Sequence, residues 1–377
     1  MREVNTISLF DRIAWRDPLS GRELEPIVFA RNPAGVPVCG ALRIAGTNTG
    51  YPIVDCVARI TPELAERHRS WLAQANLEPP ASVGSADGLQ PEATVESFGW
   101  QWTWNDDMRT DADLKMRVAD RFGVTPEWFS GQLTLDAGAG AGDQSSYILR
   151  HGGQVVSIDL SSAIEVVARK LRMNSNWFGV QGDLTALPFA SDQFDVVYCE
   201  GVIQHTRDSV ATVRELCRIA RLGGRVLATH YIRSVPRTFL RRLVRKVRLG
   251  YYELLRSRLS RMERFRLLFI CGIFASLAYV PLFGRFMRWS GTALWYELMP
   301  DFKTTWTNTY DFYGTHAFQR IITPDEFWGY FDRAGGVQTI RRDVGIVVAV
   351  KIEDREPLPA VVNHPPARAV VEENGPR

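Results

Sequence analysis

Short apolar runs alternate with helical patterns between residues 133 and 231, and this alternation is the strongest structural signal in the chain. In the intervening segments apolar side chains recur every three or four residues, as in 208–224, which ends on Gly-Gly like an amphipathic helix. The runs that read as strands are LTLDA (133–137), QVVSID (154–159), WFGVQGD (177–183), FDVVYCE (194–200) and RVLATHY (225–231). Strands alternating with helices predict an α/β fold with a doubly wound, mainly parallel seven-stranded sheet and helices on both faces.

The pattern also indicates where two of the helices begin. Ser161 or Ser162 is a natural N-cap for the helix after the second strand, and Thr323 with Pro324 would start a helix over 323–336. The stretch 337–351 then reads as a hairpin that completes the sheet.

Changes of composition predict how the chain is organised around this sheet. A Pro-, Gly- and Ser-rich stretch without periodicity reads as a linker, and the Pro-rich end reads as disordered. The predicted parts are a small β-rich module over 1–76, the linker 77–97, the α/β domain over 98–235 and 301–352, a basic and apolar helical lid insertion over 236–300, and a disordered tail over 353–377.

The charge of the chain is small overall but unevenly placed. The net charge is +3 over 377 residues, which gives no global electrostatic case for nucleic acid. Residues 237–288, however, hold thirteen Lys or Arg against Glu253 and Glu263, a local net of +11 that leaves −8 for the rest. One segment therefore carries the cationic character.

The five cysteines are scattered, and no C-x-x-C pair occurs. An odd number without framework spacing predicts reduced thiols in a cytosolic compartment. The N-terminal MREVNTISLFDR has acids early and no long apolar run, so we expect no signal peptide and a cytoplasmic protein, with membrane association left open by the basic segment.

A glycine-rich loop follows the first strand of the α/β domain, in LDAGAGAGDQSS (135–146). A dinucleotide fingerprint would place its third glycine at Asp143, where a carboxylate would repel a pyrophosphate, and no Gly-Lys-Ser/Thr of a phosphate-binding loop follows. Asp136 beside Gly138, Gly140 and Gly142 instead fits a cationic ligand, such as an amino-acid moiety with ammonium and sulfonium charges.

Two further acids end the next two strands. Asp159 stands where a carboxylate holds the ribose diol in nucleoside-binding α/β folds, and Asp183 stands where an adenine amine could be met. The carboxyl ends of parallel strands lie at the same edge of a sheet, so we expect these acids to line a single crevice there.

Four segments in this order and spacing resemble the successive motifs of class I S-adenosylmethionine-dependent methyltransferases. They are LTLDAGAGAG, VVSIDLS, VQGDLTALPFASDQFDVVYCEGVIQHT and LGGRVLATHY, and the resemblance covers roughly 98–235 and 301–351. It implies S-adenosylmethionine as cofactor and a methionine end lined by the three glycines, with Ala139 where Cys or Ser is common. The full implied cofactor set is Asp136, Gly138, Gly140, Gly142, Asp159, Leu160, Asp183, Leu184 and Glu200.

Methyl transfer from a sulfonium is an in-line displacement, so the protein mainly aligns the acceptor and excludes water. A hydroxyl acceptor additionally needs a base, and His205 in GVIQHT, just past the fourth strand, is the best-placed candidate. The alternative is that His205 buttresses the cofactor loop. Glu200 could position a substrate or meet a backbone amide.

The segment 309–327 resembles the lid segment that precedes the last helix in one branch of the family. There Tyr313, His316 and Arg320 are candidate substrate contacts, and a packed connector is the alternative. The aromatic FGWQWTW (98–104) resembles a lead-in that closes over the cofactor, or is an aromatic staple on the sheet edge.

Within the insertion, the basic stretch 237–266 precedes eighteen uncharged residues, 267–284. A membrane span is disfavoured because Gly272, Ser276 and Pro281 interrupt it and the chain must return to the same sheet. A helical lid over the crevice and docking on an anionic membrane both remain open, and docking would suit an amphiphilic acceptor.

The N-terminal module resembles a small zinc ribbon that has lost its metal. Asp17 and Ser20 occupy the places of one cysteine pair, and Cys39 and Cys56 alone remain as thiols. Two thiolates cannot close a tetrahedral structural site, so we expect no metal.

Together these features predict an S-adenosylmethionine-dependent methyltransferase. The predicted acceptor is a small molecule, a saccharide or a lipid-linked compound, and the favoured reaction is O-methylation. Two alternatives stay open: an RNA methyltransferase, since intact relatives of the ribbon include RNA-modifying enzymes, and a catalytically silent adapter that docks a membrane or partner. Few basic residues on the module argue against nucleic acid.

Overall fold

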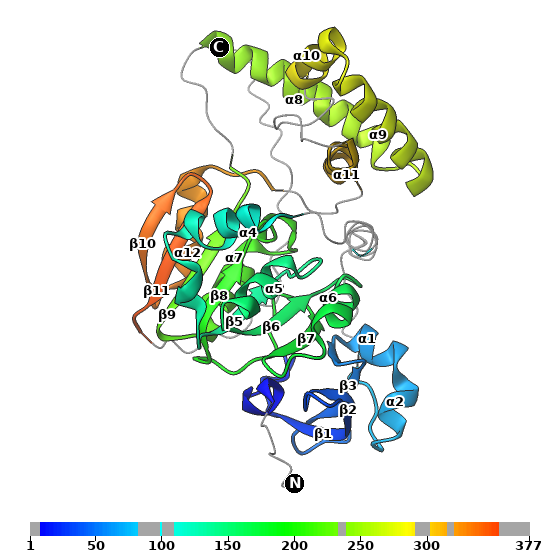
Figure 1. Cartoon of the computed structure of the whole chain (residues 1–377), viewed down its shortest axis with the longest axis vertical. Coiled ribbons are helices and arrows are strands. Elements are labelled where there is room, and N and C mark those ends of the chain that lie inside the picture. Colours follow the sequence, from blue (N-terminus) through cyan, green and yellow to red (C-terminus); the bar gives the residue numbers. More distant parts are fainter. Residues whose placement is uncertain are drawn as a thin grey trace, which may run out of the picture.

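The computed structural model describes residues 8–81, 99, 109–232, 239–290, 302–314 and 320–353, and all structural statements below concern these residues. Figure 1 shows an extended molecule, with the N-terminal strands at one end, a large α/β layer structure in the middle and a group of helices at the other end.

The central sheet contains the seven strands that the sequence predicts. Their order along the sheet is β7 (Trp177–Gly182), β6 (Gln154–Asp159), β5 (Leu133–Ala137), β8 (Phe194–Cys199), β9 (Ala220–Thr229), β11 (Ile346–Lys351) and β10 (Val337–Asp343). The pairs from β7 to β9 are parallel, and β11 runs antiparallel to both of its neighbours. The predicted hairpin over 337–351 is thus confirmed, and an α/β fold is confirmed with it.

The count of strands was wrong, because the sheet has 11 strands rather than seven. Strands β1 (Leu24–Arg31), β2 (Pro37–Ile44), β3 (Gly50–Val54) and β4 (Val57–Ile60) form an antiparallel meander, and β4 then pairs in parallel with β7. Strand β7 would otherwise be an edge strand with a row of unpaired backbone groups, and β4 satisfies them. The sheet is therefore mixed and continuous across the module and the α/β domain.

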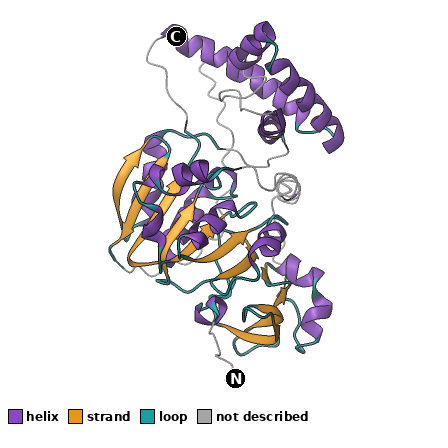
Figure 2. Ribbon diagram, viewed as in Figure 1, coloured by secondary structure: helices purple, strands orange, loops and turns teal. Residues whose placement is uncertain are grey.

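Helices cover both faces of the central strands (Figure 2). Those of the α/β domain are α4 (Asp111–Val118), α5 (Asp143–Arg150), α6 (Ile164–Leu171), α7 (Ser209–Ile219) and α12 (Pro324–Ala334), and the module adds α1 (Pro62–Arg67) and α2 (Arg69–Ala73). Single 3₁₀ turns lie at 9–12, 120–122, 126–129 and 203–205.

The helix boundaries differ from the expected ones in two places. Helix α7 ends at Ile219 rather than at the Gly-Gly, because Ala220 already begins β9. Ala163 stands at the N-cap of α6, and the hydroxyl of Ser161 donates instead to Asp159, which the sequence did not indicate. The start of α12 is as predicted, since the Thr323 side chain accepts from the Glu326 N–H.

One hydrophobic core runs through the module and the α/β domain. At their junction Phe10 and Trp15 pack on Phe178 of β7, with ring centroids 4.7 and 5.8 Å apart, and Trp15 also contacts Phe189. Aromatic burial of this size makes the module part of the same folding unit.

The predicted insertion over 236–300 contains α8 (Phe239–Leu259), α9 (Arg264–Ala278) and α10 (Pro281–Ser290). Helix α11 (Phe302–Tyr313), which the sequence assigned to the α/β domain, instead shares a separate hydrophobic core with α8 and α9, so the insertion is taken below to include α11. The uncharged run 267–284 is split, since α9 ends at Ala278 and Pro281 begins α10. In the described chain no helix combines the length and the apolarity that crossing a membrane requires.

Candidate cofactor-binding site

The acids of the predicted cofactor set lie along the carboxyl ends of the parallel strands. Asp136 is the second-to-last residue of β5, Asp159 ends β6, Asp183 directly follows β7 and Glu200 directly follows β8. Since β7, β6, β5 and β8 are consecutive neighbours in the sheet, the four acids share one edge.

The glycine loop crosses from β5 over the end of β6. The N–H groups of Gly138 and Ala139 donate to the Ile158 carbonyl at 2.8 and 3.1 Å. Gly138 has φ +84° and Gly142 φ +81°, and an added Cβ would come within 2.3 Å of Val202 and 2.8 Å of Val167, respectively. Both positions need glycine, because the backbone is left-handed and a neighbouring side chain fills the space of a Cβ.

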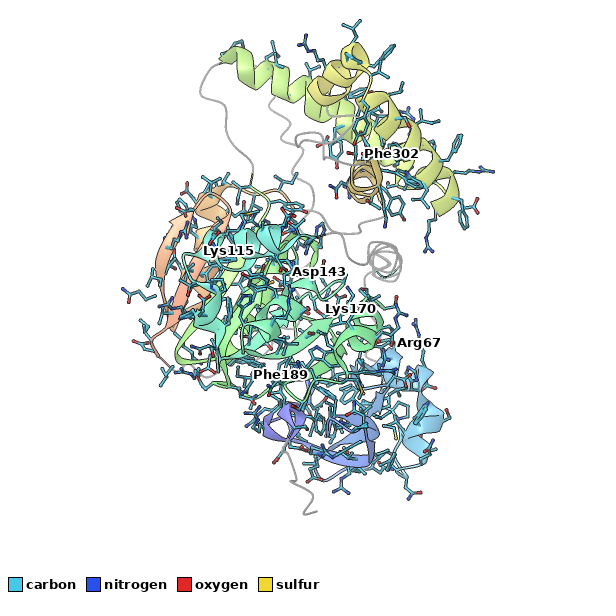
Figure 3. All side chains as sticks on the ribbon, in the orientation of Figure 1. Arg67, Lys115, Asp143, Lys170, Phe189 and Phe302 are labelled. Atoms are coloured by element: carbon cyan, nitrogen blue, oxygen red, sulfur yellow. The ribbon has the colours of Figure 1, made fainter. Side chains whose placement is uncertain are left out.

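Lys170 contacts the end of the glycine loop and the start of the following helix. Lys170 on α6 donates to the Ala141 carbonyl at 3.1 Å and lies 3.4 Å from Asp143, the first residue of α5 (Figure 3). Asp143 is the residue whose carboxylate, according to the sequence analysis, would repel a pyrophosphate. The charge pair keeps an acid at this helix start.

Asp159 ties the glycine loop to the turn after β6. Its Oδ2 accepts from the Gly140 N–H at 3.0 Å, and its Oδ1 accepts from the Ser161 N–H and hydroxyl at 2.8 and 2.7 Å. Burial raises the pKa of this carboxyl above its usual value, and the three donors oppose that rise. Asp159 as a whole residue is partly exposed.

Asp136 lies beneath the loop. It is 2% exposed and accepts from the Ser145 hydroxyl, which contacts Ser157 at 2.7 Å, and Ser157 in turn accepts from the Trp177 indole at 2.8 Å. Burial raises the pKa of Asp136 to about 7, with Asp159 and Glu200 adding to the rise. Asp136 is thus part of a buried hydrogen-bond network with Ser145, Ser157 and Trp177. The sequence did not predict this network.

We expect Asp136 to make stability fall with rising pH. Its pKa of about 7 in the folded chain exceeds the value of 3.8 of an open chain, so between these values the native state binds the extra proton. Relative to Asp136→Asn, the free energy of unfolding should fall from pH 5 to pH 7 by up to about 1.4 kcal/mol per pH unit and level off above pH 8. Urea unfolding of both proteins at four pH values measures this difference.

Titrating groups that do not interact with Asp136 contribute equally in both proteins, so they cancel in that comparison. His230, whose burial lowers its pKa to about 4, acts in the opposite direction in each. Parallel pH curves for the two proteins would contradict the prediction and show that Asp136 is ionised throughout.

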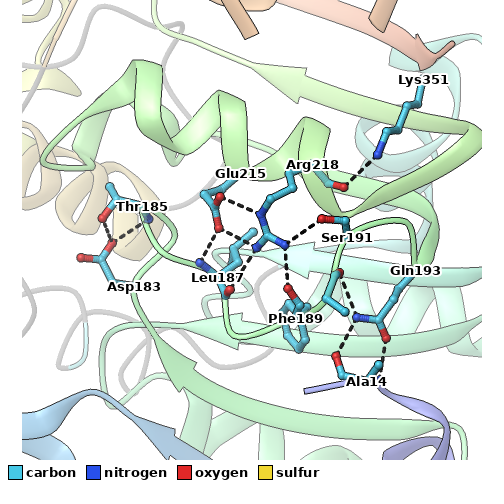
Figure 4. A network of polar contacts seen from close by, with 11 residues as sticks. Ala14, Asp183, Thr185, Leu187, Phe189, Ser191, Gln193, Glu215, Arg218 and Lys351 are labelled. Atoms are coloured by element: carbon cyan, nitrogen blue, oxygen red, sulfur yellow. Dashed lines mark hydrogen bonds and ion pairs between the residues drawn. The ribbon is translucent and has the colours of Figure 1, made fainter. Parts of the chain in front are cut away.

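The loop that carries Asp183 and Leu184 is clamped by α7 (Figure 4). Arg218 donates to the carbonyls of Leu187 and Phe189 at 3.1 and 2.7 Å, and Glu215 accepts from the Leu187 N–H at 2.8 Å. Asp183 itself accepts from the Thr185 N–H and hydroxyl at 2.8 Å, and Leu184 is buried. These contacts fix the end of the crevice near β7.

The N-terminal module also reaches this edge. Arg59 of β4 is 4% exposed, donates to the Gln181 side chain at 2.7 Å and pairs with Glu165 at 2.5 Å. The Gln181 side chain in turn donates to the carbonyl of Leu160 at 3.1 Å, and Leu160 directly follows Asp159.

Glu200 is engaged by cations that the sequence did not single out. It is almost fully buried and accepts from Arg117 at 3.2 Å, from Arg121 and from the Tyr198 hydroxyl at 2.8 Å. Arg117 lies on α4 and Arg121 in the following 3₁₀ turn. Their spacing of four residues in a helical pattern indicates that the two arginines share one face. The sequence alone does not indicate that this face contacts Glu200.

His205 lies in the 3₁₀ turn after β8, half-buried, with its ring against Tyr231 at 5.6 Å between centroids. Arg320 holds this turn: its guanidinium donates to the carbonyls of Thr206 and Arg207 at 2.9 and 2.6 Å, and its N–H donates to the Gln204 carbonyl. The side chain of Gln204 is fully buried, and neither of its amide atoms has a hydrogen-bond partner within the described chain.

Two of the three predicted substrate contacts lie in the described residues, and these two are not brought together. Tyr313 is buried in the core of the helical insertion, against Tyr252 and Phe274, whereas Arg320 lies at the His205 turn. His316 falls outside the described residues, as does the aromatic stretch 98–104 apart from Gly99.

Asp17 and Ser20, which the sequence places where a zinc ribbon would have its first cysteine pair, are joined by hydrogen bonds. Asp17 accepts from the Ser20 N–H and hydroxyl, at 2.9 and 2.5 Å, and from the Tyr51 hydroxyl at 2.7 Å. Burial raises the pKa of the Cys56 thiol to about 11. Within the described ranges, no three His, Cys, Asp or Glu side chains are placed to hold a metal ion.

A glycine loop between β5 and α5, followed by acids at the ends of β6 and β7 in one sheet, is an arrangement typical of nucleoside-binding α/β domains. Residues 135–228 match the family model described as a methyltransferase domain. The prediction of a methyltransferase is thereby confirmed at the level of this domain.

Relatives share this part of the chain at modest identity. A demethylmenaquinone methyltransferase of Thermobifida fusca is 32% identical over 27% of this chain and 45% of its own length. A ubiquinone biosynthesis O-methyltransferase of Pseudomonas paraeruginosa is 31% identical over 29% of this chain and 49% of its own. The chain thus spans about half the length of the curated relatives it matches.

Among solved structures, the 1,6-didemethyltoxoflavin-N1-methyltransferase of Burkholderia thailandensis, bound to S-adenosylhomocysteine, is 14% identical. The match covers 73% of this chain and 95% of that chain, with a TM-score of 0.39. At this distance no functional residue is transferred from it.

Proposed function

We propose that this protein is an S-adenosylmethionine-dependent methyltransferase. The observation that carries the proposal is the cradle formed by the glycine loop, in which Gly138 and Gly142 have no room for a Cβ and Asp159 joins the loop to the end of β6. The glycine backbone packs closely against Val202 and Val167, and the carboxylate of Asp159 accepts from it. An acid at this edge of the sheet suits a nucleoside with a cationic amino-acid end better than a polyphosphate.

In this proposal each part of the crevice has one role. Asp159 would accept from the ribose hydroxyls, Asp183 and the buried Leu184 would flank the adenine, and the loop from Gly138 to Gly142 would line the methionine end. Glu200, with its arginine partners, would close the side near β8. When bound, the cofactor supplies the electrophilic methyl group, and the chain supplies alignment and exclusion of water.

His205 is the proposed proton acceptor for a hydroxyl substrate. It stands at the rim of the crevice, it is half-buried, and Arg320 fixes the turn that carries it. Arg320 is a positioning residue here, because its guanidinium is used up by backbone carbonyls of the turn. An unpartnered Gln204 side chain in the same turn offers a donor and an acceptor to a bound substrate.

We propose an amphiphilic small molecule as acceptor and O-methylation as reaction. Two observations support this proposal. Relatives are named as methyltransferases of demethylmenaquinone and of ubiquinone biosynthesis, and the insertion, which follows the carboxyl end of β9 in the chain, exposes many apolar side chains. We also propose that the N-terminal module is a ribbon in which the Asp17, Ser20 and Tyr51 hydrogen bonds replace a metal.

The test is calorimetric titration with S-adenosylmethionine and S-adenosylhomocysteine, followed by transfer of labelled methyl groups to a panel of amphiphilic phenols, saccharides and RNA. Micromolar binding together with transfer to a phenol that drops at least about a hundredfold in His205→Gln supports the proposal. Absence of cofactor binding in folded protein would favour the silent adapter, and transfer to RNA would replace the acceptor class.

A further inference from the structure

Helix α8 has two apolar faces. Tyr252 and Leu259 point into the core of the insertion and are buried. A second set, spaced three or four residues apart, is exposed on the other side: Phe239 (82%), Leu243 (49%), Val247 (63%), Tyr251 (39%) and Leu254 (53%). A helix on a protein surface in water normally turns polar residues outward. An exposed apolar stripe of this kind therefore indicates an interaction surface.

The next two helices repeat this arrangement. On α9, Leu267 and Cys271 are buried, whereas Phe265 and Phe269 are 75% and 71% exposed and lie one turn apart with Ile273 next in line. On α10 the exposed apolar side chains are Leu282 (80%), Phe283 (58%) and Phe286 (54%). The outward side chains of these helices are visible in Figure 3.

Cationic side chains accompany the exposed apolar ones. Residues 237–288 contain thirteen Lys or Arg and two acids. Arg266, 80% exposed, lines one apolar hollow with Met262, Phe265, Phe269 and Ile270, and its ion-pair distance to Glu263 is a long 3.9 Å. A long basic side chain beside aromatic ones can keep its stem in an apolar phase and its charge at a polar boundary.

We propose that α8, α9 and α10 dock on the surface of an anionic lipid bilayer. The exposed apolar stripes would enter the boundary between headgroups and acyl chains, and the arginines and lysines would meet lipid phosphates. A second copy of the chain fits this face less well, because a symmetric dimer would bring two segments of net charge +11 together.

The location of the surface links it to the crevice. The chain leaves the carboxyl end of β9 at Thr229, enters α8 at Phe239 and returns from α11 to Arg320 at the His205 turn. A bilayer held by α8–α10 would therefore lie on the side of the sheet where the cofactor site opens. The docking stands without the proposed methyl transfer, and it would deliver an amphiphilic acceptor to that edge.

The experiment is co-sedimentation of the full chain with vesicles of phosphatidylcholine alone and with one quarter phosphatidylglycerol, at 0.1 and 0.5 M NaCl. We expect binding to the anionic vesicles that is at least about tenfold stronger than to neutral ones and that weakens at high salt. The double variant Phe265→Ser/Phe269→Ser should lose at least about tenfold in partitioning. Arg261→Gln/Arg266→Gln should remove most of the preference for the anionic lipid.

A matched control replaces exposed apolar side chains on a different surface. Ile340 and Val344, 52% and 71% exposed at the β10–β11 hairpin, are changed to serine and should leave vesicle binding unchanged. Thermal melting and cofactor titration check that every variant is folded. Binding that ignores lipid charge, binding unaffected by the phenylalanine pair, or a dimer in light scattering that the pair abolishes would each overturn the proposal.

Discussion

Asp159→Asn is expected to weaken the binding of S-adenosylmethionine about a hundredfold. The proposed role of Asp159 is to accept two hydrogen bonds from the ribose while its oxygens remain bonded to Gly140 and Ser161. Hydrogen bonds to a charged acceptor contribute about 1.5–3 kcal/mol each, and asparagine offers one neutral acceptor and a misplaced donor. A loss of about 3 kcal/mol corresponds to the stated change in Kd, which titration calorimetry measures.

Asp325→Asn is the matched control for this experiment. Asp325 is an exposed acid in the first turn of α12, away from the carboxyl ends of β6 and β7, so its removal should leave the Kd within about twofold. Equal Kd values for the two variants would contradict the assignment of Asp159 to the ribose, whereas a melting temperature lowered in Asp159→Asn alone would point to the loop bonds instead.

Gly138→Ala is expected to destabilise the fold by about 2–5 kcal/mol. Its φ of +84° costs an alanine about 1–2 kcal/mol, and the new Cβ would stand 2.3 Å from a Val202 methyl, which adds an overpacking cost of about 1–3 kcal/mol. The displaced Val202 begins the turn that carries His205, so activity should fall more than stability alone explains. Urea unfolding measures the loss of stability, and the methyl-transfer assay measures the loss of activity.

Gly131→Ala separates the two costs. Gly131 has a similar φ of +73°, but nothing lies within 4 Å of an added Cβ. This variant should lose only about 1–2 kcal/mol, the backbone cost alone. If Gly138→Ala were no worse than Gly131→Ala, the close approach of Val202 would not limit the glycine loop.

The cofactor side of the candidate site could be predicted from the sequence because its geometry is local. A strand, a glycine loop and a helix determine where Gly138 stands, and two later strand ends determine Asp159 and Asp183. The roles of Asp136 and Glu200 could not be predicted in this way. Asp136 is set by contacts to Ser145 and, through Ser157, to Trp177, and Glu200 by Arg117 and Arg121 about eighty residues earlier.

The same distinction holds for the substrate side. Sequence neighbourhood placed Tyr313 and Arg320 in one lid segment, but they lie in different places, because Tyr313 belongs to the core of the insertion and Arg320 binds the turn at Thr206. Seven residues of chain are long enough to connect two separately packed units, and the pattern of apolar positions does not say which unit each side chain joins.

By itself the sequence determined the seven central strands, their alternation with helices, the hairpin over 337–351 and the acids at the strand ends, since each follows from a local period or a local motif. Tertiary structure alone decided that β4 extends the sheet at β7, that α7 gives way to β9 at Ala220, and that α8 and α9 each keep one apolar stripe outside their shared core. These outcomes depend on which surfaces meet after collapse, and hydrophobic periodicity records that a face is apolar without recording what covers it.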